Sequence, residues 1–133
     1  MSLKQPHIVL AHGGGGQLTD ELVGSTVLPR LGNATLSDLL DSAVMLAGDQ
    51  RIATTIDSYV VQPLQFPGGD IGRLAISGTV NDLAVCGARP LGIALSMILA
   101  EGLERAVLEQ VLDSVAQAAA EAGVSVVTGD TKV

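Results

Sequence analysis

Apolar residues follow two different periodicities along the chain, and the switches between them predict an ordered series of strands and helices. Helical spacing of apolar positions predicts helices over 18–27, 71–84 and 103–122, with Asp70 as the cap of the second and Gly87 and Gly123 closing the last two. Short apolar runs predict strands over 7–11, 43–47, 51–55, 91–99 and 124–128, the second and third joined as a hairpin. This order predicts an α/β (α+β-like) domain with helices on one face of a mixed or antiparallel sheet.

The run over 91–99 is almost continuously apolar, which predicts a strand that is buried on both faces. After the three helices cover one face of the sheet, the sequence offers no further element for the other face. A second copy of the chain would cover it, so we expect a homodimer.

Composition narrows the possible functions. The 133 residues suit about one domain, and we expect that domain to span 1–133. The net charge of -7 and the scarcity of aromatic residues, Tyr59 and Phe66, argue against nucleic acid as a partner. The most apolar stretch, over 91–100, is about half of the roughly 20 residues that a membrane span needs. A single cysteine and opening residues without a long apolar segment favour the cytoplasm.

Three aspartates stand out because of where they fall in the predicted elements. Asp57 and Asp130 follow predicted strands, and Asp82, beside Asn81, lies within an otherwise apolar helix. Carboxylate oxygens from separate elements suit Mg²⁺, which takes one or two carboxylates together with phosphate oxygens and water. The alternative is that Asp57 and Asp130 close turns while Asp82 faces water.

The four consecutive glycines Gly13, Gly14, Gly15 and Gly16 lie between a predicted strand and a predicted helix. Their bare backbone would let N–H groups approach a phosphate closely, although a flexible linker explains the glycines equally well. Lys132 offers a phosphate a point charge, or is an ordinary exposed lysine. Cys86 has no base nearby in the sequence and is interpreted as a packing residue.

Several segments together resemble HypE, a family of hydrogenase maturation factors within the aminoimidazole ribonucleotide synthetase (PurM) superfamily. The matching strings appear in the family's order and cover nearly the whole chain: 10–17 (LAHGGGGQ), 55–61 (TIDSYVV), 66–72 (FPGGDIG), 78–84 (GTVNDLA) and 127–133 (VTGDTKV). The resemblance implies a PurM-like N-terminal domain that dimerises through its sheet into a shared barrel.

The resemblance also implies a reaction. Members of this family use ATP to dehydrate a carbamoyl group on a C-terminal cysteine to a thiocyanate, the source of cyanide for [NiFe] hydrogenases. Carried over to this sequence, the pattern implies that Gly13–Gly16 cover the triphosphate. It also implies that Asp57, Asp82 and Asp130 contact Mg²⁺ or Mg-ATP, with Asn81 and Lys132 as further cofactor contacts. The implied partners are the carbamoyltransferase HypF and the HypC–HypD complex.

The sequence departs from the family pattern at its end. It stops at Val133, without the second α/β domain and the terminal cysteine, so the catalytic residue is unassigned and we expect no complete dehydration by this chain alone. Two alternatives stay open. One is another ATP-using member of the superfamily, of the thiamine monophosphate kinase or selenophosphate synthetase type, and the other is a non-catalytic module that dimerises and docks.

Overall fold

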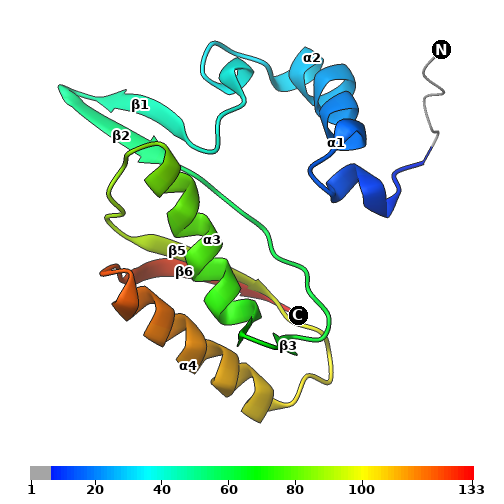
Figure 1. The fold of residues 1–133 in the computed structure, drawn as a ribbon, viewed down its shortest axis with the longest axis vertical. Coiled ribbons are helices and arrows are strands. Elements are labelled where there is room, and N and C mark those ends of the chain that lie inside the picture. Colours follow the sequence, from blue (N-terminus) through cyan, green and yellow to red (C-terminus); the bar gives the residue numbers. More distant parts are fainter. Residues whose placement is uncertain (1–6) are drawn as a thin grey trace. The chain divides into compact units, whose positions relative to one another are not determined.

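The computed structural model describes residues 7–133, in two compact units: residues up to Leu40, and Asp41–Val133 (Figure 1). The opening residues 1–6, in which no leader segment is expected, lie outside the described residues. The prediction of one domain across all 133 residues stays a prediction. In residues 7–133, no helix has the length and apolar character needed to cross a membrane.

The first unit is helical. A 3-10 turn, η1 (Leu10–Gly13), precedes α1 (Gln17–Leu22), a π-helical turn η2 (Val23–Val27), α2 (Leu28–Leu31) and a second 3-10 turn η3 (Leu36–Asp38). The predicted helix over 18–27 is therefore confirmed and runs on to Leu31. The strand predicted over 7–11 is wrong, because the chain there closes a turn in which the Val9 N–H donates to Nδ1 of His12.

The second unit begins with the predicted hairpin. Strands β1 (Ala43–Ala47) and β2 (Gln50–Thr54) pair antiparallel, with Ala47 opposite Gln50 across the turn. Residues 55–61 then continue without regular structure to a small antiparallel pair, β3 (Gln65–Phe66) and β4 (Gly69–Asp70). This pair occupies a segment that its prolines and glycines mark as a turn region.

Helix α3 (Ile71–Val85) begins at the predicted cap, because the Asp70 carboxylate accepts a hydrogen bond of 2.8 Å from the Arg73 backbone N–H. Strand β5 (Ile93–Ile98), helix α4 (Arg105–Glu121) and strand β6 (Val126–Lys132) follow. Strands β5 and β6 pair in parallel, with α4 as the crossover that a parallel pair requires. Figure 1 shows α3 and α4 side by side, over the β5–β6 pair.

Within residues 7–133 the strands form three separate two-stranded sheets, and this corrects the prediction of one mixed sheet. Parallel and antiparallel pairing both occur, but in different pairs. The last strand also extends further than predicted: β6 runs through Gly129 and Asp130 to Lys132 instead of ending at Thr128. A glycine fits at position 129 because the absence of a Cβ leaves room for the backbone of Leu95 on β5.

The core lies between the two helices and β5. Ile76 of α3 is 1% exposed and packs with apolar residues of α4, of β5 and of the turn before β6: Ile93, Val115, Ala118, Ala119 and Val124. Strand β5 is covered on one face only, since Ile93 is buried whereas Ala94, Ser96 and Ile98 are exposed. The prediction that this strand is buried on both faces is therefore wrong for the described chain, because the helices cover a single face.

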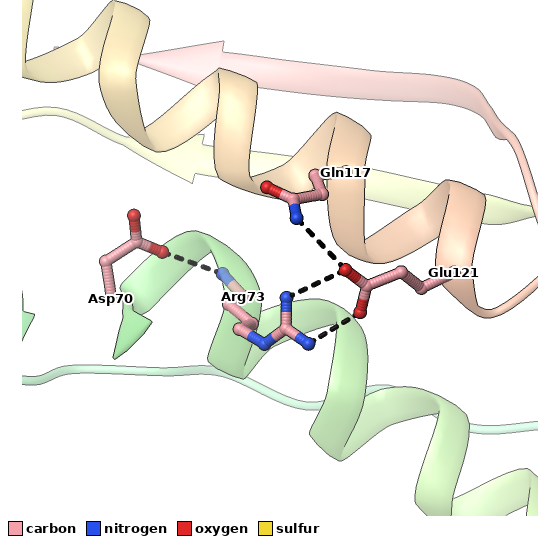
Figure 2. A network of polar contacts seen from close by, with 4 residues as sticks. All are labelled: Asp70, Arg73, Gln117 and Glu121. Atoms are coloured by element: carbon pink, nitrogen blue, oxygen red, sulfur yellow. Dashed lines mark hydrogen bonds and ion pairs between the residues drawn. The ribbon is translucent and has the colours of Figure 1, made fainter. Parts of the chain in front are cut away.

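A polar network joins the two helices on their outer side (Figure 2). The Arg73 guanidinium contacts both carboxylate oxygens of Glu121, and Gln117 donates to Glu121 Oε1 over 3.1 Å. The backbone N–H of Arg73 also donates to the carboxylate of Asp70, the N-terminal cap of α3. One residue thus connects the start of α3 to the end of α4.

Candidate functional site

Asp57 and Tyr59 lie two residues apart on the segment that follows β2, and their side chains meet. The Tyr59 hydroxyl donates a hydrogen bond of 2.7 Å to Oδ2 of Asp57. Burial of the phenol, followed by its hydrogen bond to the Asp57 carboxylate, raises the pKa of Tyr59 to about 12. Asp57 itself is exposed, which leaves its carboxylate accessible to a ligand.

Asp82 is half-buried on α3 and faces the same segment. Thr55 Oγ1 lies 2.9 Å from Asp82 Oδ2 and 2.8 Å from the backbone carbonyl oxygen of Asp41, so its one proton serves one acceptor at a time. The negative charge of Asp82 adds to that of Asp57 in raising the pKa of Tyr59. The structure therefore brings two of the three predicted aspartates to one segment, Asp57 through Tyr59 and Asp82 through Thr55.

Asp130 has a different environment. It lies within β6, and its carboxylate forms an ion pair with Lys132 Nζ, 2.7 Å from Oδ2 and 2.8 Å from Oδ1. The two residues are two positions apart on a strand and so share a face. Both side chains are largely exposed, at 59% and 68%, and such pairs exchange readily with other ligands.

Residues 7–133 contain no group of three or more His, Cys, Asp or Glu side chains arranged to hold a metal ion. The expected convergence of Asp57, Asp82 and Asp130 on one ion is therefore not seen within this chain. Two carboxylates still match the donor set of Mg²⁺, which prefers hard oxygen ligands and commonly takes one or two carboxylates beside phosphate oxygens. Asp57 and Asp82 fit that description.

The glycine-rich loop belongs to the first unit and connects η1 to α1. Gly15 has a φ of 72°, a left-handed conformation that favours glycine. Its N–H donates to Thr19 Oγ1 over 3.0 Å, and the N–H of Gly14 bonds to the Ala11 carbonyl oxygen. Gly13–Gly16 are all exposed, so their backbone is accessible while two of its amides make local bonds.

Asn81 and Cys86, two further candidates, both lie toward the C-terminal end of α3. Asn81 is exposed on α3, next to Asp82. Cys86 is exposed at the C-terminal cap of α3, which corrects its interpretation as a buried packing residue. The helix ends there, and its last turn contributes little to the core. An open apolar hollow of about 460 Å³ between α4, β5 and β6 is lined by none of the predicted site residues.

Sequence reasoning missed Thr55, Tyr59 and Thr79. Thr55, Asp57 and Tyr59 recur at every second position, which in an extended segment puts all three on one side. This every-second-residue spacing was the sequence signal that could have identified Thr55 and Tyr59 as neighbours of Asp57. Thr79, whose side chain acts on the pKa of Tyr59, lies on α3 and had no local signal, because the helix meets this segment only in the folded chain.

The second unit thus defines a class of α/β domain in which two helices cover a parallel strand pair and acidic side chains gather between a hairpin and a helix. The chain belongs to the family described as AIR synthase related protein, N-terminal domain, whose sequence model matches residues 40–133. The match includes all three predicted aspartates and leaves the glycine-rich loop outside it.

Similarity to individual proteins extends over the whole chain. The chain is 47% identical over 136 aligned residues to the carbamoyl dehydratase HypE of Rhodobacter capsulatus. The alignment covers all of this chain and 40% of that protein. A solved HypE in complex with ATP matches with a TM-score of 0.62 and 46% identity, over 96% of this chain and 38% of that one. A solved HypE–HypF complex matches with a TM-score of 0.78 and 42% identity, over 84% and 36%. The chain spans about two fifths of the length of such relatives.

Proposed function

We propose that this chain is the ATP-binding and dimerisation part of a carbamoyl dehydratase of the HypE kind, acting in hydrogenase maturation. The observation that carries the proposal is similarity along nearly the entire chain, at 46% identity, to a HypE protein solved with ATP. The names of the relatives support the reaction class, since several are called carbamoyl dehydratase HypE. The single cysteine favours a reducing compartment, and we infer the cytoplasm.

The proposed reaction removes water from a carbamoyl group carried on a cysteine, with ATP activating the carbamoyl oxygen as a leaving group. Cys86 is a poor candidate for the carrier, because it caps a helix instead of lying on a segment free to reach a distant site. No other cysteine occurs among the 133 residues. We therefore expect nucleotide binding by this chain but no complete dehydration.

Each predicted site residue has a proposed role. Asp57 and Asp82 would hold Mg²⁺, supported by their oxygen donors beside Tyr59 and Thr55. Asp130 would join them in contact with the metal or its nucleotide after exchange of the Lys132 ion pair, which would free Lys132 for a phosphate. Asn81 would add a further nucleotide contact. In the first unit, the exposed backbone of Gly13–Gly16 would offer N–H groups to a phosphate, as the family resemblance implies. Bound Mg-ATP would supply the phosphoryl group, and its Mg²⁺ would offset the negative charge of the phosphates.

Calorimetric titration of the chain with ATP and Mg²⁺ tests the binding proposal. We expect wild-type binding, and a loss of about tenfold or more in Asp57→Asn and in Asp82→Asn, because each change removes a negative charge from the metal ligands. Asp113→Asn, an exposed aspartate of α4, is the matched control and should bind like wild type. Unchanged binding in the first two variants would remove the metal assignment, and no binding by wild type would remove the proposal.

The second candidate function, a dimerisation and docking module, is favoured by the uncovered face of the β5–β6 pair. On this face Ala94 and Ile98 are both exposed, Ile98 at 87%, and an apolar surface left uncovered on a strand pair is typical of an interface. A relative solved as a HypE–HypF complex supports HypF as one partner. The HypC–HypD complex remains a partner expected only from the family resemblance.

Light scattering after size-exclusion chromatography tests self-association. We expect a dimer at tens of micromolar, and a shift toward monomer in Ile98→Glu, since the charge would be buried in the interface. Glu101→Gln, an exposed change just beyond the strand, is the control. A wild-type monomer at that concentration would count against the dimer. Dimerisation without ATP binding would favour the docking module over the enzyme part.

A further inference from the structure

Tyr59 makes contacts that the proposed binding roles do not account for. Its hydroxyl donates to Asp57 and lies against Gly78 of α3. The phenol therefore bridges the extended segment and the helix at a point where the segment has no strand partner. A bond of this kind fixes the orientation of an otherwise exposed carboxylate.

Gly78 of α3 lies directly under the Tyr59 phenol. A Cβ atom at position 78 would overlap the Tyr59 hydroxyl oxygen and would come within 2.9 Å of Cζ and 3.2 Å of Cε1. Because Gly78 has no side chain, the phenol of Tyr59 can lie this close to the helix backbone. The position of the hydroxyl is thus set by the helix surface as well as by its hydrogen bonds.

The same helix carries Asp82 four residues later, about one turn further along. Asp82 accepts from Thr55, which lies four residues before Tyr59 on the extended segment. Two contacts, Thr55 with Asp82 and Tyr59 with Gly78, therefore align the segment against α3 on either side of Asp57. Asp57 has its own side chain fixed only through Tyr59 among the hydrogen bonds described.

We infer that Tyr59 is a positioning residue for the metal and nucleotide site: seated on Gly78, its hydroxyl holds the Asp57 carboxylate in the orientation that receives a divalent cation. The inference rests on the proposed function. It assigns to Tyr59 no contact with the ligand itself. It also gives a role to a tyrosine beside a glycine of α3, where a phenylalanine would fill the same space without fixing Asp57.

The test compares Mg-ATP binding by the wild-type chain with binding by Tyr59→Phe, which removes the hydroxyl and keeps the ring. We expect about a tenfold weaker association, since the lost bond is to a charged group. Ser58→Ala, at the exposed neighbouring position, should bind like wild type. Equal binding by Tyr59→Phe and wild type overturns the inference and leaves the proposed function standing. Failure of wild type to bind overturns both.

A spectroscopic measurement separates positioning from a general structural effect. Tyr59 is the single tyrosine of the chain, so incorporation of 3-fluorotyrosine gives one fluorine resonance from this position alone. We expect the resonance to shift when Mg-ATP binds, and the shift to be lost in Asp57→Asn. A resonance that stays in place while calorimetry records binding would show that Tyr59 does not sense the site, and the inference would fall.

Gly78→Ala supplies an independent route to the same hydroxyl. The added methyl displaces the phenol, so we expect Gly78→Ala to weaken Mg-ATP binding by about as much as Tyr59→Phe. Because both changes act through one hydrogen bond, the double variant should bind no more than about twofold weaker than either single variant. Multiplicative losses in the double variant would contradict the inference. Circular dichroism confirms that each variant is folded before titration.

Discussion

Gly72 of α3 packs directly against the backbone carbonyl oxygen of Val111 on α4. A Cβ at position 72 would overlap that oxygen and lie 3.0 Å from Cγ2 of Val115. Since the obstacle is backbone, it has no alternative rotamer. The packing of α3 on α4, which forms much of the core, therefore depends on a missing side chain.

Gly72→Ala should destabilise the fold by about 1–3 kcal/mol, the usual cost of overpacking a well-filled interior. Urea denaturation followed by circular dichroism measures the change. Gly69→Ala is the matched control, because its added Cβ would meet only ordinary contacts at 3.6 Å or more and should change stability little. A Gly72→Ala variant as stable as the control would show that the helices separate without cost.

Asp70 is the N-terminal cap of α3 and is only 7% exposed, so its carboxylate has few solvent contacts to replace the bond to the Arg73 N–H. Asp70→Ala should lower the free energy of unfolding by about 0.5–2 kcal/mol. Asp70→Asn keeps an oxygen acceptor and should lose less. Urea denaturation midpoints of wild type, Asp70→Ala and Asp70→Asn provide the comparison. An equal loss of stability in the two variants would argue against capping as the cause.

The ion pair of Arg73 with Glu121 predicts a response to acid. The Arg73 guanidinium, by hydrogen bond and charge, holds the pKa of Glu121 below its ordinary value of 4.5. A lowered pKa contributes stability that is present above the unfolded value and is lost as pH falls through the folded value. Arg73→Gln should therefore flatten the acid side of the stability profile measured by thermal unfolding, and added salt should reduce the difference.

Much of the second unit follows from local sequence signals. The hairpin is fixed by two apolar runs around Gly48, the start of α3 by Asp70, and the end of α4 by Gly123 with its φ of 66°. These signals act within a few residues of one another, so one sequence suffices to find them. The family resemblance added what local patterns do not contain, including the significance of the glycine-rich loop.

The errors arose where distant contacts decide the outcome. The segment over 7–11 has the composition of a strand, yet without a pairing partner its backbone closes a local turn around His12. Apolar composition at β5 indicated burial on two faces, but only the helix-covered face is buried here. The link between Tyr59 and α3 was invisible for the same reason, since Gly78 and Thr79 meet it only after folding.

The Tyr59 hydroxyl predicts a response at the alkaline end of the pH range. Burial first, and then the hydrogen bond and charge of Asp57, raise its pKa from 10.0 to about 12, so the folded state favours the neutral phenol. A raised pKa contributes stability that is complete below 10 and is lost as pH rises toward 12. Urea midpoints of the wild-type chain should therefore fall over that interval more steeply than those of Tyr59→Phe, which has no phenolic proton to lose.

Asp57→Asn should lower the pKa of Tyr59. Tyrosinate absorbance measures this pKa directly, because Tyr59 is the single tyrosine and the chain has no tryptophan. A tyrosinate titration that is the same in wild type and Asp57→Asn would mean that the bond between the two side chains is not formed in solution.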